Sequence, residues 1–102
     1  IHALIRARKL AKDYELRSQI WRATISIMSN IAEGFERVNP NEFHHFLVIA
    51  KASCAEVRSQ LYIALDTECI TQDEFSTLNA QAQDLARTIG ALRASVDRYR
   101  KH

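Results

Sequence analysis

Two residues of this chain stand at the spacing of a known type of metal site. Glu42 and His45 form a Glu-x-x-His pair, the spacing with which some helical bundles hold two iron ions. Such a site needs a second copy of the pair and two further glutamates. The chain carries one copy, at the start of an expected helix. We therefore interpret this pair as a solvated helix start, and we expect no bound metal.

The residues that could act as nucleophiles lack the partners that catalysis requires. A nucleophilic serine, cysteine or lysine needs a base within reach and a third group that orients the base. No such partner stands at a diagnostic spacing, and no glycine-rich phosphate loop is present. The side chains considered are Ser26, Ser29, Lys51, Cys54 and Cys69. We predict a protein that is not an enzyme and that carries no cofactor.

Four polar residues fall on helix faces that are otherwise apolar. Buried polar groups must be hydrogen-bonded, or each costs about 1–3 kcal/mol. One interpretation is a small-molecule or metal site inside a bundle. The interpretation that we favour is a buried polar network that fixes the register of the helices, completed by Arg22 or Arg58. The four residues are Asn30, Glu33, Glu56 and Gln60.

Charge is distributed unevenly along the 102 residues, although the net charge is only +2. Residues 1–22 carry six basic and two acidic side chains, and residues 87–102 carry five basic and one acidic. Residues 23–86 carry three basic and nine acidic side chains. The chain is therefore basic at both ends and acidic in the middle, a pattern that favours a polar distribution of charge in the folded molecule.

Helices account for the whole pattern of apolar residues. With two glycines and one proline, the chain has few helix breakers, and apolar residues recur at intervals of three and four. Asn39, Pro40 and Glu42 form a helix start with a possible capping box, and Thr71 and Glu74 form a second box. We expect helices over residues of about 1–11, 16–35, 40–68 and 72–100, with a polar break at 12–15.

The second of these helices is apolar on two faces. A surface helix of a monomer usually shows one apolar stripe, so a second stripe predicts burial against another chain. We expect one stripe to enter the core and the other to form an oligomer interface. The predicted interface residues are Trp21, Ile25, Met28 and Phe35.

Four helices joined by short loops predict an all-α, antiparallel, up-down-up-down four-helix bundle. We expect it to be a single, elongated domain over residues 1–102. In this topology Asp66, Glu68, Asp73 and Glu74 form an acidic pole. The opposite pole is basic and could neutralise the phosphates of RNA or DNA. Its residues are Arg6, Arg8, Arg37, Arg93, Arg98, Arg100 and Lys101.

Two long motifs carry a family resemblance. SQIWRATISIMSNIAEG at 18–34 and EFHHFLVIAKASCAEVRSQLYIA at 42–64 closely resemble the bacterial 23S rRNA intervening-sequence proteins, a family of four-helix bundles. A related branch, the accessory variability determinants of diversity-generating retroelements, forms basic pentamers that bind nucleic acid. The resemblance therefore implies a homopentamer. Trp21 and Met28 depart from the family, which usually has a basic residue and a proline there.

The sequence predicts a non-enzymatic homo-oligomer that binds RNA or DNA, or alternatively a structural scaffold whose partner is another protein. No apolar run approaches the roughly 18 residues that a membrane span needs. Cys54 and Cys69 suit reduced thiols in the cytoplasm. Because the chain begins at Ile1 rather than Met, we also expect some sequence to precede it.

Overall fold

The computed structural model describes residues 2–100, and among these the side chains of 3–4 and 11–100. It contains three helices: α1 spans His2–Phe35, α2 spans Pro40–Asp66 and α3 spans Gln72–Asp97. No strand occurs in this part of the chain. The all-α class is confirmed, whereas the prediction of four helices is wrong.

The error lies in the polar segment 12–15, where a break was expected. This segment is helical and joins the two predicted helices into the single 34-residue α1. The segment contains neither glycine nor proline, and polar residues alone do not end a helix. Asp13 also finds a partner, because the Cys69 thiol donates a hydrogen bond to its carboxylate at 2.7 Å. The antiparallel up-down-up-down topology is therefore replaced by three antiparallel helices.

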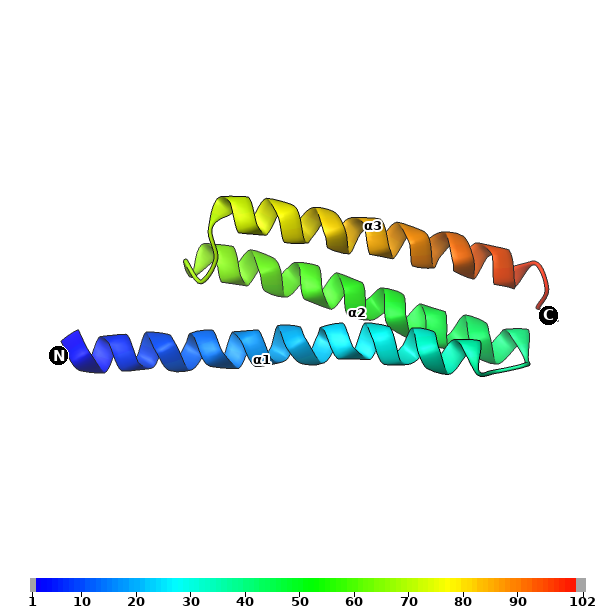
Figure 1. Ribbon diagram of the computed structural model, residues 1–102, viewed down its shortest axis with the longest axis horizontal. Helices are drawn as coiled ribbons and strands as arrows, with labels where there is room; N and C mark the ends of the chain where they lie inside the picture. The colour runs from blue at the N-terminus through cyan, green and yellow to red at the C-terminus, as the bar shows by residue number, and fades with distance from the viewer. Residues whose placement is uncertain (1, 101–102) are drawn as a thin grey trace.

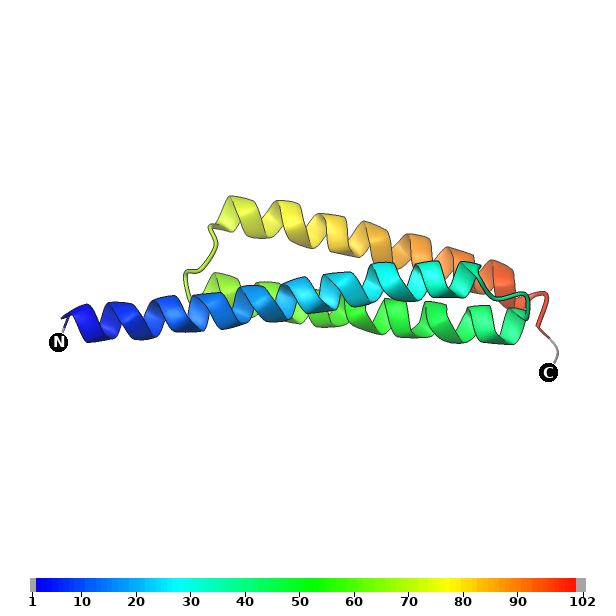
Figure 2. The ribbon, with the colours of Figure 1, turned by 60° about the horizontal axis from the view of Figure 1, so that its bottom comes forward.

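The three helices lie side by side with α2 in the middle (Figure 1). Both α1 and α3 pack on α2, and no Cα atom of α1 lies within 8 Å of one in α3 in the described part of the chain. The N-terminal end of α1 extends past the loop between α2 and α3 (Figures 1 and 2). With principal extents of 62 × 21 × 18 Å, the molecule is elongated, as predicted.

Both predicted helix starts are present. The Asn39 side chain accepts the backbone N–H of Asn41 at 2.8 Å, although Glu42 does not complete the expected box. At α3, Thr71 Oγ1 accepts the N–H of Glu74, and the Glu74 carboxylate accepts the N–H of Thr71. These hydrogen bonds lower the pKa of Glu74, because they stabilise its charged form. The capping box therefore fixes the start of α3.

The core follows α2 along its length. Leu47 and Cys54 are its largest fully buried side chains, and α1 and α3 each add residues from one face. Buried apolar residues come from all three helices: Ala23, Ile27, Leu47, Ala50, Cys54, Val57, Leu61, Ala64, Phe75, Ile89 and Val96. Because α2 contributes most of them, it organises the packing of the other two helices.

Gly34 permits a close approach of α1 to α2. A Cβ atom at this position would lie 2.9 Å from Phe43 Cδ1 and 3.3 Å from Phe46 Cβ. Both distances are shorter than comfortable van der Waals contact, and the second involves an atom fixed to the α2 backbone. Gly90 differs, because a Cβ there would meet only the flexible end of Lys51, at 3.4 Å.

We expect alanine to have opposite effects at the two glycines. Gly34→Ala should lower the free energy of unfolding by a net value of about 1 kcal/mol, since overpacking costs more than the helix propensity that alanine adds. Gly90→Ala should raise it by about 0.5–1 kcal/mol. Urea unfolding followed by circular dichroism measures both. Equal stabilisation by the two substitutions would contradict the close contact at Gly34.

Candidate functional site

The four predicted interface residues are all exposed on α1. Trp21 is 65% exposed, Ile25 44%, Met28 63% and Phe35 63%. Ala23 and Ile27 are buried in the core, and side chains two positions away on a helix point to nearly the opposite side. We call the exposed side the outer face of α1, defined by Tyr14, Trp21, Ile25, Met28 and Phe35.

The outer face extends along α1. Tyr14, Trp21, Met28 and Phe35 follow one another at intervals of seven residues, the repeat by which helices pack along a seam. Phe35 is partly supported by Phe43, with ring centroids 5.0 Å apart. Soluble monomers rarely expose large contiguous apolar patches, so this row of exposed apolar residues is a candidate interaction surface. The structure thus leaves the four predicted interface residues exposed and places them on one side of one helix.

The predicted buried polar residues do not form one network. Asn30 donates hydrogen bonds to the carbonyl oxygen of Ser26 at 2.7 Å and to its hydroxyl at 3.2 Å. That hydroxyl in turn lies 3.0 Å from the Ser53 hydroxyl on α2. Glu33 is exposed and pairs with Arg37 at 2.6 Å. The sequence analysis considered Ser26 only as a nucleophile, whereas in the structure the Ser26–Ser53 pair makes a polar link between α1 and α2.

A second polar cluster lies further along the same two helices. Gln60 is 7% exposed, and its Nε2 donates a long hydrogen bond of 3.4 Å to Glu56. Its Oε1 is buried and has no hydrogen-bond partner among the described residues. Both residues line a hollow of about 460 Å³ together with Gln19, Arg22, Ala23 and Ser26. Arg22 thus lies in the same hollow as Gln60, whereas Arg58 is bonded to Asn79 on α3.

The predicted basic pole is divided between the two ends of the molecule. Arg37, Arg93, Arg98 and Arg100 belong to the end where α1 meets α2 and where α3 terminates (Figure 1). Residues 6 and 8 lie on the N-terminal part of α1, at the opposite end. The basic residues are separated because α1 is continuous and the chain does not reverse direction at 12–15. Lys101 lies outside the described residues.

Two of the four arginines at this end are engaged by other side chains. Arg100 donates to Asn41 at 3.0 Å and to Asp97 at 2.8 Å. Arg37 pairs with Glu33, and its guanidinium lies 5.2 Å from the ring centroid of Phe46. Among the described residues, no hydrogen bond or ion pair engages the side chain of Arg93 or Arg98. The charge available to a ligand is therefore smaller than the sequence suggests.

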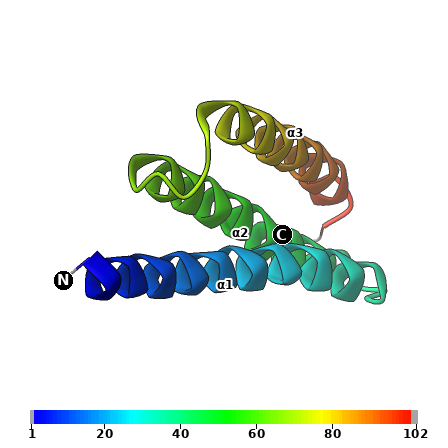
Figure 3. The same cartoon turned by 60° about the vertical axis from the view of Figure 1, so that its left-hand side comes forward.

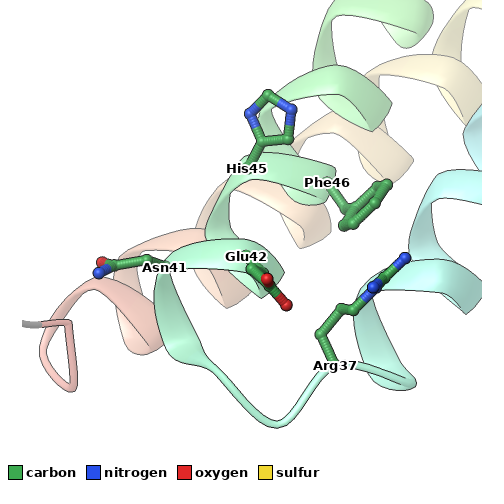
Figure 4. Close-up of a pocket in the computed structure, with 5 residues that line it drawn as sticks. All are labelled: Arg37, Asn41, Glu42, His45 and Phe46. Carbon is green, nitrogen blue, oxygen red and sulfur yellow. The ribbon is translucent and has the colours of Figure 1, made fainter.

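Arg37 also borders a hollow of about 380 Å³ at the start of α2, lined in addition by Asn41, Glu42, His45 and Phe46. In Figure 4 the Glu42 carboxylate extends toward the α1 side, whereas Asn41 and His45 point away from it. Glu42 and His45 thus do not converge on one point. No group of three or more His, Cys, Asp or Glu side chains in the described part of the chain could hold a metal ion.

The acidic residues lie where the sequence predicts, at the end formed by the α2–α3 loop. Asp66 ends α2, Glu68 lies in the loop with φ 61°, and Asp73 and Glu74 begin α3. Acidic side chains in the first turn of α3 suit its dipole. The basic N-terminal segment of α1 emerges beside this loop (Figure 3), so acidic and basic segments share one end of the molecule.

We expect Gln60→Met to stabilise the chain. The buried Oε1 without a partner costs about 1–3 kcal/mol, and methionine has a similar volume without that cost. Because the hydrogen bond to Glu56 is long, its loss should subtract little. The free energy of unfolding in urea should rise by about 1 kcal/mol. A fall of the same size would mean that Gln60 has a partner essential to the fold.

Comparison with known proteins supports the family that the two motifs of this chain resemble. Within residues 2–100 no helix is long and apolar enough to cross a membrane. No curated protein and no solved structure matches the chain. The model of the family described as 23S rRNA-intervening sequence protein matches residues 1–91, a range that includes both motifs. The chain therefore belongs to the family of 23S rRNA-intervening sequence proteins.

Proposed function

We propose that this protein is a non-enzymatic scaffold whose copies associate through the outer face of α1. The observation that carries the proposal is the exposure of Trp21, Met28 and Phe35 at seven-residue intervals on one helix. Burying such side chains contributes roughly 1.5–3 kcal/mol each. Aromatic residues are also the side chains most enriched in association surfaces.

The shape of α1 supports a ring of copies. The family usually has proline at position 28, and methionine there leaves α1 without a kink at that position. An unbroken helix presents its apolar stripe along one line, so that neighbouring copies can pack side by side. A homopentamer is the assembly that the family resemblance supports. Two free cysteines, one of them buried in the core, support a reducing compartment such as the cytoplasm.

Binding of RNA or DNA is the second candidate function. Arg93 and Arg98 support it, because their guanidinium groups are not engaged by a carboxylate within residues 2–100. A ring would present several copies of this weak site, and multivalency raises the apparent affinity without any new contact. Without nucleic-acid binding, the protein would be a scaffold whose other partner is a protein.

The outer face is tested by introducing charge into it. Trp21→Glu and Met28→Glu should each shift sedimentation toward smaller species while helicity is retained, because an unpaired buried carboxylate opposes association. Ile63→Glu is the matched control, since Ile63 is 49% exposed and lies on α2. A wild-type monomer at micromolar concentration would contradict the proposal.

The arginines are tested separately. Arg93→Ser combined with Arg98→Ser should weaken binding to a generic RNA and lower its dependence on salt, because each lost phosphate contact reduces counterion release. Filter binding at several salt concentrations measures both effects. Unchanged affinity and salt dependence would remove the end of α3 from the binding surface.

A further inference from the structure

A groove between α2 and α3 collects basic side chains. It has a volume of about 440 Å³ and is lined by Lys51, Arg58, Gln83, Ala86, Arg87 and Gly90. Lys51 and Arg58 are seven residues apart on α2 and therefore share one face of that helix. Arg87 and Gly90 are three residues apart and share one face of α3. We call this site the α2–α3 groove.

The concentration of positive charge here is unusual for this chain. Residues 23–86 carry only three basic side chains against nine acidic ones, and two of the three lie in the groove. Arg87 from α3 joins them, and no carboxylate is among the described residues that line the groove. Most of the positive charge on α2 and α3 thus lies in the groove, whereas the charged residues elsewhere on these two helices are mainly acidic.

The three cations are held differently. The Nε of Arg58 donates to Asn79 Oδ1 at 3.3 Å, which fixes its side chain across the helix pair. Arg87 pairs with Asp84, which lies one turn earlier on α3, and both side chains are largely exposed. No hydrogen bond or ion pair engages Lys51 among the described residues, and its Nζ lies against Gly90. Since Gly90 has no side chain, it leaves room for the ammonium group at the floor of the groove.

We propose that the α2–α3 groove binds the phosphodiester backbone of a nucleic-acid strand. Lys51 and Arg58 are separated by about 10 Å along the helix axis, and cations spread in this way suit successive phosphates better than one small anion. No aromatic side chain lines the groove among the described residues, so bases cannot stack there. The contact is therefore to phosphates and independent of sequence.

The proposal rests on the nucleic-acid role considered above, and it adds a contact surface on the flank of the molecule. The groove is formed by α2 and α3, whereas the outer face belongs to α1. A strand bound in the groove would therefore not compete with self-association. Arg93 and Arg98 at the end of α3 would meet the same strand only if it continued toward that end.

The test uses the full chain and a fluorescently labelled single-stranded RNA of mixed sequence. Lys51→Gln combined with Arg87→Gln should raise the Kd about tenfold at low salt. The slope of log K against log salt should fall by about 1.4, the value for two phosphate contacts on a single strand. Lys12→Gln combined with Arg17→Gln removes the same charge from exposed positions of α1 and is the matched control. Circular dichroism verifies that both variants remain helical.

A second pair of variants acts on the floor of the groove. Gly90→Glu places a carboxylate beneath Lys51 and should weaken binding, whereas Gly90→Gln introduces a side chain of the same size without charge and should weaken it less. Competition with inorganic phosphate separates a strand from a free anion. Displacement of the RNA at an equal concentration of phosphate groups would overturn the proposal in favour of a small-anion site.

The remaining outcomes separate this proposal from the function on which it rests. If Lys51→Gln with Arg87→Gln behaves like its control while Arg93→Gln with Arg98→Gln abolishes binding, the protein binds nucleic acid at its end and the groove is not the site. If the wild-type chain binds no RNA at low salt, both the groove and the nucleic-acid role are overturned.

Discussion

The packing of two helices on a third is the constraint on which this structure depends. α2 lies between α1 and α3, and within residues 2–100 no Cα atom of α1 lies within 8 Å of one in α3. α1 and α3 can each bury only the face that they turn toward α2. Ile27 on α1 and Ile89 on α3 are examples of the residues buried there. Because α1 and α3 do not cover each other, apolar residues remain exposed on both helices, among them Met28 and Leu78. The exposed apolar surface of α1 and α3 thus follows from the number of helices.

The close approach at Gly34 sets where α1 can lie on α2. The glycine allows Phe43 and Phe46 to pack directly against the α1 backbone, and the Ser26–Ser53 hydrogen bond holds the two helices in register further along. Once these contacts fix the rotation of α1, Ala23 and Ile27 face inward and Trp21 and Ile25 must face outward. The outer face is therefore a consequence of the same packing that forms the core.

The sequence predicts the parts of this fold that depend on local chemistry. Thr71 and Glu74 satisfy the N–H groups of their own helix start, so their pattern is sufficient to place it. The prediction of a break at 12–15 was wrong because polar residues alone do not end a helix, and the segment contains neither glycine nor proline. The hydrogen bond between Asp13 and Cys69 is a distant contact that no local pattern reveals. The prediction of one basic pole was wrong for the same reason as the predicted break. Because the chain does not reverse direction at 12–15, residues 6 and 8 lie at the other end of the molecule. The α2–α3 groove joins residues of α2 to residues of α3 that are at least 25 positions away, and only the tertiary packing brings them together.

The two proposed surfaces use different physical forces and lie on different helices. Association along α1 would depend on burial of apolar area, which salt does not weaken. Contact with phosphates in the α2–α3 groove would depend on charge, and it would weaken steeply as salt screens the cations. A ring held together by the first surface would repeat the second around its circumference, so that several weak phosphate sites act on one strand. The charge of one copy is small, and assembly is the means by which this family member could bind a polyanion firmly.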